Sequence, residues 1–153
     1  MGRSGRDMVD VHTLLNSLRS LLDGCTVTLF SWKFWGIKPL GKFHFFTDEE
    51  VVGLDQELVA KLDWARGRAG VPFTITSGLR SPSQNKTVKG VQDSAHLRGL
   101  GVDLRVENGS ARFKMVQALL LAGFRRIGIY DKHIHADRDE TLPQDVIWVG
   151  ESH

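Results

Sequence analysis

The segment 131–137, DKHIHAD, places ionisable side chains at alternate positions. In a β-strand successive side chains point to opposite faces, so Asp131, His133, His135 and Asp137 would share one face. Four ionisable groups on one strand face make a poor core. The segment therefore predicts a strand whose polar face either forms the wall of a site or belongs to a solvated edge strand.

Apolar spacing and capping signals predict a mixture of helices and strands. The run Thr47-Asp48-Glu49-Glu50 is a capping box, and the apolar positions from Val51 to Ala65 indicate a helix that follows it and ends between Gly67 and Gly70. The other elements expected are a helix over 11–22, strands over 26–30, 73–76, 100–106, 125–130, 132–137 and 146–149, and a long polar loop over 79–99. This pattern favours an α+β fold in which helices pack on a small, mostly antiparallel sheet.

A further helix is expected over 110–122. Ser110 is a suitable N-cap for it, and Gly123 is a suitable C-terminal stop. The apolar residues at helical spacing, which should form its buried face, are Phe113, Val116, Leu119 and Leu120.

Composition and charge exclude several classes of protein. The 153 residues suit one globular domain, and 41% hydrophobic with 25% charged residues is ordinary for a chain that buries a core. A formal net charge of +2 is too small to indicate nucleic-acid binding through bulk charge, and no apolar run approaches the roughly 18 residues that cross a bilayer. The single cysteine, Cys25, excludes an intramolecular disulfide and a cysteine zinc cluster, so a metal site must use His, Asp or Glu.

The chain is expected to divide near residue 42. Residues 1–42 form an N-terminal extension that packs on or precedes the core, and residues 43–153 form the main domain. The aromatic segment of the extension, with Trp32 and Trp35, either packs on the core or provides a contact surface. Because acidic residues interrupt the basic start before any apolar stretch, we expect no secretory signal and synthesis in the cytoplasm.

Two further residues join the polar strand in a candidate metal site. His96 lies at the end of the long polar loop, and Asp103 lies in an otherwise apolar strand, where an unpaired carboxylate would be costly to bury. Either a metal ion or one of the arginines, Arg80 among them, could be the partner of Asp103. With His135 the set has two imidazoles and one carboxylate, which is typical of catalytic zinc. Zinc would lower the pKa of its water from about 15.7 towards roughly 7, and a neighbouring base would take the proton.

Several blocks of the sequence together resemble one known family. They are ITSGLRSP at 75–82, Asn85, SAHLRG at 94–99, VDL at 102–104, GFRRIGIY at 123–130, HIHAD at 133–137 and Trp148. In this order they resemble the zinc D-Ala-D-Ala carboxypeptidase family, the M15 peptidases, over about residues 43–149. The resemblance implies an α+β domain with a zinc site at the centre of its sheet.

The resemblance also implies roles for individual residues. His96, Asp103 and His135 correspond to the zinc ligands, and Arg80 to an arginine that holds the substrate carbonyl or carboxylate. Many relatives carry Glu or Asp three residues before the last ligand, where this chain has Lys132.

The general base must therefore be another residue. His133 and Asp131 are the two candidates, and His133 is preferred. Asp137 is expected to orient a ligand imidazole or a neighbouring loop, because a metal-bound imidazole usually donates its second N–H to a carboxylate or carbonyl.

The function implied is zinc-dependent hydrolysis of peptidoglycan stem or cross-link peptides at bonds that involve D-amino acids. A phage or prophage lytic enzyme, acting on the cell wall after release, is the first expectation. A housekeeping bacterial D-Ala-D-Ala carboxypeptidase or dipeptidase is the second. Lys132, in place of the usual acid, keeps open a catalytically inactive cell-wall or peptide binding module, and an incidental His cluster in a structural protein is the remaining alternative.

Overall fold

The computed structural model of the protein describes residues 42–150. The helix expected over 11–22, the strand expected over 26–30 and the aromatic segment with Trp32 and Trp35 lie outside the described residues. Among the described helices, none has the length and apolar character needed to cross a bilayer.

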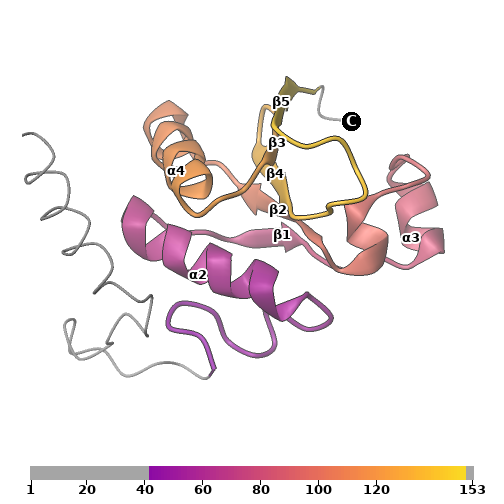
Figure 1. Cartoon of the computed structure of the whole chain (residues 1–153), viewed down its shortest axis with the longest axis horizontal. Coiled ribbons are helices and arrows are strands. Elements are labelled where there is room, and N and C mark those ends of the chain that lie inside the picture. The colour runs from indigo at the N-terminus through magenta and orange to yellow at the C-terminus, as the bar shows by residue number, and fades with distance from the viewer. Residues whose placement is uncertain (1–41, 151–153) are drawn as a thin grey trace, which may run out of the picture. The chain divides into compact units, whose positions relative to one another are not determined.

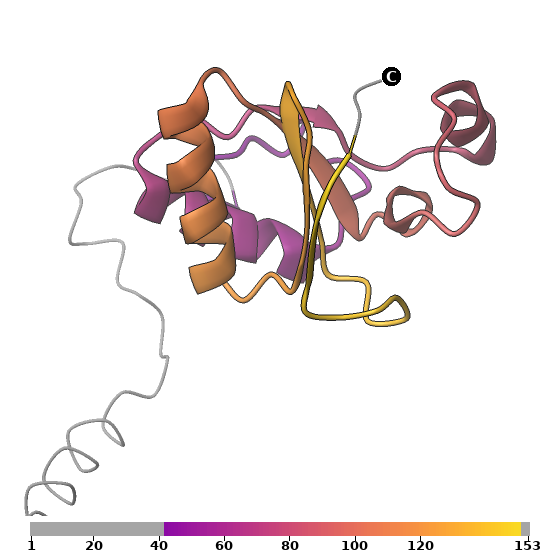
Figure 2. The same cartoon turned by 90° about the horizontal axis from the view of Figure 1, so that it is seen from above.

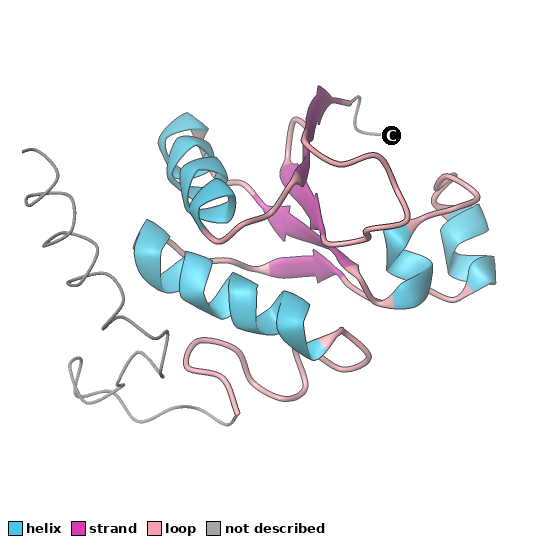
Figure 3. Cartoon of the chain, viewed as in Figure 1, coloured by secondary structure: helices cyan, strands magenta, loops and turns pink. Residues whose placement is uncertain are grey.

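The described residues form a five-stranded sheet with two longer helices on one side of it (Figure 1, Figure 2). In chain order the elements are α2 Gln56–Ala69, β1 Ile75–Ser77, α3 Pro82–Thr87, the 3-10 helix η2 Ala95–Arg98, β2 Gly101–Arg105, α4 Gly109–Leu121, β3 Arg126–Ile129, β4 His133–Asp137 and β5 Val146–Val149. The strand order is β1-β2-β4-β3-β5, and only the β3–β5 pairing is parallel. The α+β class with a mostly antiparallel sheet is therefore confirmed (Figure 3).

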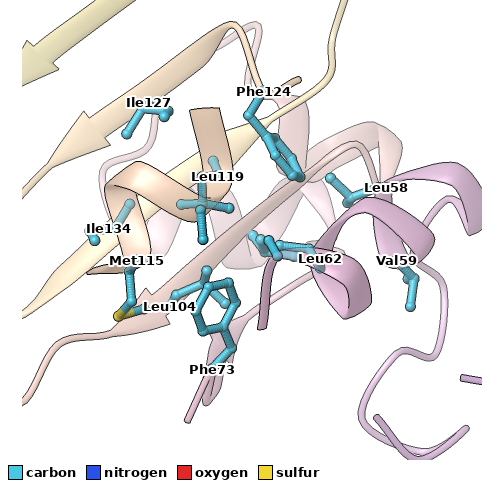
Figure 4. Close-up of a cluster of buried hydrophobic side chains, with 14 of the residues drawn as sticks. Leu58, Val59, Leu62, Phe73, Leu104, Met115, Leu119, Phe124, Ile127 and Ile134 are labelled. Atoms are coloured by element: carbon cyan, nitrogen blue, oxygen red, sulfur yellow. The ribbon is translucent and has the colours of Figure 1, made fainter. Parts of the chain in front are cut away.

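The hydrophobic core lies between the sheet and helices α2 and α4 (Figure 4). Helix α2 contributes Leu58 and Leu62, and α4 contributes Met115 and Leu119. The sheet contributes Val102, Leu104, Ile127, Ile134 and Ala136, each 0% exposed. Because side chains alternate along a strand, this burial places the polar residues between them on the opposite face of β2 and β4. One face of the sheet therefore packs in the hydrophobic core, and the opposite face carries the polar side chains of β2 and β4.

Helix α2 begins later than its capping signal predicts. The capping box does form, since Thr47 N–H donates to Glu50 Oε2 at 2.9 Å and Glu50 N–H donates to Thr47 Oγ1 at 3.3 Å. It closes a turn, however, and the chain then passes through Gly53 with φ 75°, a left-handed conformation that a continuous helix does not contain. The expectation that the helix follows the capping box at once is wrong.

The true ends of α2 are set by Asp55 and Gly70. The Asp55 carboxylate accepts a hydrogen bond from Leu58 N–H at 2.9 Å, as an N-cap does. Gly70 has φ 62°, and its N–H bonds Arg66 O, so the helix ends in a left-handed glycine. The predicted C-terminal end of this helix is confirmed.

The polar segment 79–99 is not a simple loop. It contains two short helices, α3 and η2, where only a loop was expected. Ser81 caps α3 through a second capping box with Gln84, and Pro82 occupies the first turn. Gly99, with φ 68°, ends η2. Short polar helices without an apolar stripe give no periodic hydrophobic pattern. Only their capping residues, such as Ser81 and Gly99, could have indicated these helices in the sequence.

Helix α4 begins at a different residue from the one expected, and only part of its predicted buried face is buried. Its N-cap is Asn108, whose side chain accepts a hydrogen bond from Ala111 N–H at 2.9 Å. Phe113 and Leu120 are 67% and 48% exposed, so their predicted burial is wrong. Leu119 is buried as predicted, and Val116 is partly buried against the core. Met115 and Ala118 are also buried, which was not predicted. This helix carries apolar residues on both sides, so its pattern does not distinguish the buried side from the exposed one.

The strands are found near their expected positions. The strands expected over 100–106, 125–130, 132–137 and 146–149 are β2, β3, β4 and β5. β2 and β3 are one residue shorter at each end, β4 begins one residue later, and β5 has the predicted bounds. β1 begins at Ile75, two residues later than expected, and Phe73 precedes it with 1% exposure as part of the core.

Candidate metal centre and cleft

Strand pairing and two glycines bring the candidate ligands together. β2 and β4 pair with Asp103 opposite His135, which places a carboxylate beside an imidazole on the face away from the helices. Gly101 begins β2, and a Cβ there would lie 3.1 Å from His135 Cε1. At Gly99 a Cβ would lie 2.3 Å from Gly53 O, so only glycine lets η2 pack closely enough to present His96.

Three ligand atoms from these elements converge on one point. His96 Nε2 lies 3.3 Å from Asp103 Oδ1 and 3.2 Å from His135 Nδ1. His135 Nδ1 lies 3.0 Å from the same carboxylate oxygen. His96, Asp103 and His135 therefore form a group that could hold a metal ion, as the sequence predicts for these residues.

The outer nitrogens of the two imidazoles fix which atoms face the centre. His96 Nδ1 lies 2.7 Å from Gly78 O, and His135 Nε2 lies 3.0 Å from Asp137 Oδ2. Both partners are acceptors, so both outer nitrogens donate, and in the neutral rings the inner nitrogens carry lone pairs. Two nitrogen lone pairs and a carboxylate oxygen at about 3 Å from one another require a cation among them, either a proton on one ring or a metal ion.

The pKa shifts agree with this requirement. Burial alone would raise the pKa of Asp103, but its hydrogen bonds with His135 and His96 outweigh burial and hold the pKa well below its usual range. Burial would lower the pKa of His135, but its hydrogen bonds with Asp103 and Asp137 reverse that effect and raise the pKa. Both shifts favour an ionised carboxylate next to positive charge.

Asp137 is itself held in place by two further donors. Its carboxylate accepts from Arg126 Nε at 3.0 and 3.1 Å and from the N–H of Asp139 at 3.1 Å, and the residue is 1% exposed. The Trp148 ring lies 5.7 Å from the His135 ring and packs over Gly128, where a Cβ would lie 2.7 Å from the indole. Asp137 and Trp148 thus restrain the His135 ring on the side away from the other two candidate ligands. The sequence predicts this orienting contact for Asp137.

Arg80 meets Asp103 on the side away from the imidazoles. Its guanidinium pairs with Asp103 Oδ2, and its Nε donates to Ser77 Oγ at 2.7 Å. The sequence left either an arginine or a metal ion open as the partner of Asp103. The geometry accommodates both, because one carboxylate oxygen faces Arg80 and the other faces the imidazoles.

The arrangement agrees with the comparison with known families. A family model described as Peptidase M15 matches residues 42–137. The chain belongs to the M15 peptidase family. Membership places it among the metallopeptidases, and the match contains all three candidate ligands and Arg80. No curated protein matches the chain.

The two candidates for the general base of this M15 peptidase have different surroundings. His133 lies on β4 with Nε2 4.0 Å from Asp103 Oδ1, and its ring stacks on Tyr130 at 4.3 Å and 11°. Burial lowers the pKa of His133 and so favours the neutral ring, which is the form that can accept a proton. Asp131 lies in the exposed turn before β4 and is absent from the residues that line the cleft.

The site of this M15 peptidase opens into a cavity of about 780 Å³. His133, Tyr130 and Trp148 line it on the sheet side, and Lys89 and Val91 line it from the segment after α3. No pattern in the sequence indicates a role for Arg126 or Lys89. The contact of Arg126 with Asp137 follows from the β3–β4 register, which pairs these residues, and no pattern in one sequence reveals that register.

Proposed function

We propose that this M15 peptidase is a zinc enzyme that hydrolyses peptidoglycan stem or cross-link peptides at bonds involving D-amino acids. The observation that carries the proposal is the convergence of His96, Asp103 and His135 within 4.8 Å at the floor of a cleft. Two imidazoles and one carboxylate form a three-ligand set of the kind that leaves zinc an open position. A divalent ion held there supplies a Lewis acid for a carbonyl group and acidifies water.

The side chains around the three candidate ligands have separate roles in the proposed reaction. His133 accepts the proton from water and later delivers it to the leaving amine, since its neutral ring faces the same cavity. Arg80 stabilises the negative charge that develops on the substrate oxygen, because a guanidinium stays charged at all relevant pH values. Asp137, Arg126 and Trp148 keep the His135 ring in one orientation. The peptide bond is hydrolysed without a covalent enzyme intermediate.

We further propose that the enzyme is a phage or prophage lytic enzyme, made in the cytoplasm and acting on the cell wall after release. The resemblance to a family that includes wall-lytic endolysins supports this setting. A housekeeping D-Ala-D-Ala carboxypeptidase or dipeptidase is the alternative within the same chemistry. A binding module without activity is the alternative outside it, and Lys132 is the observation that favours it.

Metal analysis and digestion of defined muropeptides test the proposal together. The purified protein is expected to contain about one zinc ion per chain and to release products that mass spectrometry assigns to one bond. His133→Ala should keep the metal and lower kcat by roughly 10²–10⁴-fold, as loss of a general base does. Asp131→Ala, the matched change in the neighbouring turn, should alter kcat by less than about threefold.

Three outcomes would overturn the proposal in different ways. Stoichiometric zinc with intact muropeptides under all conditions favours the binding module. Absence of stoichiometric metal favours a structural protein. Loss of activity in Asp131→Ala with full activity in His133→Ala reverses the assignment of the base.

A further inference from the structure

His133 is held differently from the other two imidazoles of the cleft. His96 and His135 each bond an acceptor through an outer ring nitrogen, at 2.7 and 3.0 Å. Among residues 42–150, neither ring nitrogen of His133 has a hydrogen-bond partner. Its Nε2 lies 4.0 Å from Asp103 Oδ1, which is too long for a hydrogen bond. Another kind of contact must therefore set the direction of the His133 ring.

The register of β3 and β4 places an aromatic ring beside His133. The two strands pair Ile129 with Ile134, so Tyr130 and His133 form the next pair, and Tyr130 N–H donates to His133 O at 3.0 Å. Because Ile134 lies on the core face, His133 and its cross-strand partner lie on the cleft face. There the two rings stack, with their centroids 4.3 Å apart and their planes 11° from parallel.

Two glycines and Trp148 fix the position of the Tyr130 ring. A Cβ on Gly150 would lie 2.2 Å from Tyr130 Cε1, so glycine directly after β5 leaves room for the tyrosine ring. Gly128 leaves room for the Trp148 indole in the same way. The indole Nε1–H donates to Tyr130 Oη at 3.2 Å, and the indole lies 5.7 Å from the His135 ring. One indole therefore contacts both Tyr130 and a candidate metal ligand.

From these contacts we propose that Tyr130 is a positioning residue, which holds the His133 ring in the orientation that faces the candidate metal ligands. The inference rests on the proposed function, which makes His133 the general base, and adds the residue that keeps this base in place. A parallel stack restricts the rotation of an imidazole that has no hydrogen bond of its own. Trp148 restrains Tyr130 in turn. In this role Tyr130 acts through His133 and does not bond the substrate.

Proton NMR of the full-length, zinc-loaded protein tests the orientation without any turnover. The probes are the carbon-bound ring protons of His133, which are assigned by their loss in His133→Ala. In the wild type we expect nuclear Overhauser effects between these protons and the Tyr130 ring, and His133 resonances that the ring current of Tyr130 shifts upfield. Tyr130→Phe should keep both effects, because it keeps the ring. Tyr130→Leu should lose the upfield shift.

Kinetics on defined muropeptides distinguishes a positioning role from a substrate contact. Tyr130→Leu should lower kcat by roughly 10-fold or more, since misplacing a catalytic group by about 1 Å can cost about 100-fold. KM should change by less than about twofold, because the substitution removes no bond to substrate. Tyr130→Phe should keep kcat within about threefold of wild type, because the stack needs the ring and not the hydroxyl. Metal analysis should find the same zinc content in both variants as in the wild type.

A second background tests whether Tyr130 acts through His133. Once the imidazole is absent, Tyr130 has no base to orient, so adding Tyr130→Leu to His133→Ala should change kcat by less than about twofold. Phe113→Leu is the matched control, because it removes an exposed ring of α4 that does not line the cleft. It should leave kcat and the His133 resonances unchanged. Circular dichroism of each variant verifies folding.

The outcomes separate this inference from the proposed function. The inference is overturned by a wild type without ring-to-ring Overhauser effects, by His133 resonances that Tyr130→Leu leaves in place, or by an equal loss of kcat in both backgrounds. A raised KM with unchanged kcat also overturns it, because Tyr130 would then contact the substrate. If His133→Ala keeps full activity, the proposed base is wrong, and the NMR spectra alone decide whether Tyr130 orients the ring.

Discussion

At the scale of single residues, Asp103 and Asp139 show how buried carboxylates are kept ionised. Asp103 divides its two oxygens between Arg80 and the imidazole pair, so neither oxygen lacks a donor or a cation. Asp139 is 0% exposed and accepts hydrogen bonds from Arg98 Nε at 2.6 Å and Thr141 Oγ1 at 2.6 Å. Its own N–H donates to Asp137. It therefore connects η2, which carries His96, to the carboxylate behind His135.

Replacing Asp139 should weaken the fold in a pH-dependent way. Burial alone would raise the pKa of Asp139, but hydrogen bonds from Thr141 and Arg98 outweigh it and lower the pKa. A group whose pKa is lower in the folded state stabilises the protein above its unfolded pKa of about 3.9, and this contribution is lost as the pH falls through the folded pKa. Asp139→Asn should therefore lower the free energy of unfolding by about 2–4 kcal/mol at pH 5–8.

Urea unfolding of both proteins between pH 8 and pH 3 measures this difference. The gap between wild type and Asp139→Asn should narrow below about pH 4. Asp145→Asn is the control, because Asp145 pairs with Arg125 on the exposed surface, and its urea midpoint should stay close to that of wild type. A gap of constant size across the whole pH range would contradict the role given to the Asp139 charge.

At the scale of elements, helix α4 shows which features a single sequence specifies. Its position between two strands follows from apolar periodicity, and so does the burial of Leu119, but its first residue and the rest of its buried side do not. Asn108 and Ser110 are both good N-caps, and tertiary context selects Asn108. Phe113 and Met115 are both apolar, and only packing against α2 and the sheet decides that Met115 is buried.

The start of α4 can be tested with one pair of substitutions. Asn108→Ala removes the hydrogen bond to Ala111 N–H and should lower the free energy of unfolding by about 1 kcal/mol. Ser110→Ala removes no capping bond and, because alanine is the better helix former, should change stability by less than about 0.5 kcal/mol. Urea unfolding at pH 7 checks both variants, and a larger loss in Ser110→Ala would show that the helix begins where the sequence pattern predicts.

As for α4, local sequence patterns predict part of the candidate site, and tertiary packing determines the rest. Alternation predicts that His133 and His135 share a strand face, since that is a property of one strand. The approach of His96 depends on Gly99, Gly101 and the packing of η2. Residue types suggested His96 as a ligand and the resemblance to a family supported it, but neither specifies this packing. The role of Arg126 depends on the β3–β4 register and has no signal in local sequence.

At the scale of the whole described molecule, the two faces of the sheet differ in function: one stabilises the fold and the other carries the candidate site. The face towards α2 and α4 buries aliphatic side chains, and the other face carries the candidate ligands. These ligands come from η2, β2 and β4, so a bound ion would join segments that are otherwise linked by strand pairing and a few side-chain bonds. Metal binding should therefore stabilise the domain as a whole as well as serve catalysis.

Removal of the metal should consequently lower Tm. An ion that binds only the folded state stabilises it by about 2.7 kcal/mol when its free concentration is 100 times Kd, which corresponds to roughly 5–11 °C for a chain of this size. Differential scanning fluorimetry with zinc, and then with excess chelator, measures the shift. Asp103→Asn loses a candidate ligand and should show no zinc-dependent shift, whereas Asp139→Asn keeps all three ligands and should show the shift from a lower starting Tm. A Tm that zinc raises equally in wild type and Asp103→Asn would place the stabilising ion elsewhere in the protein.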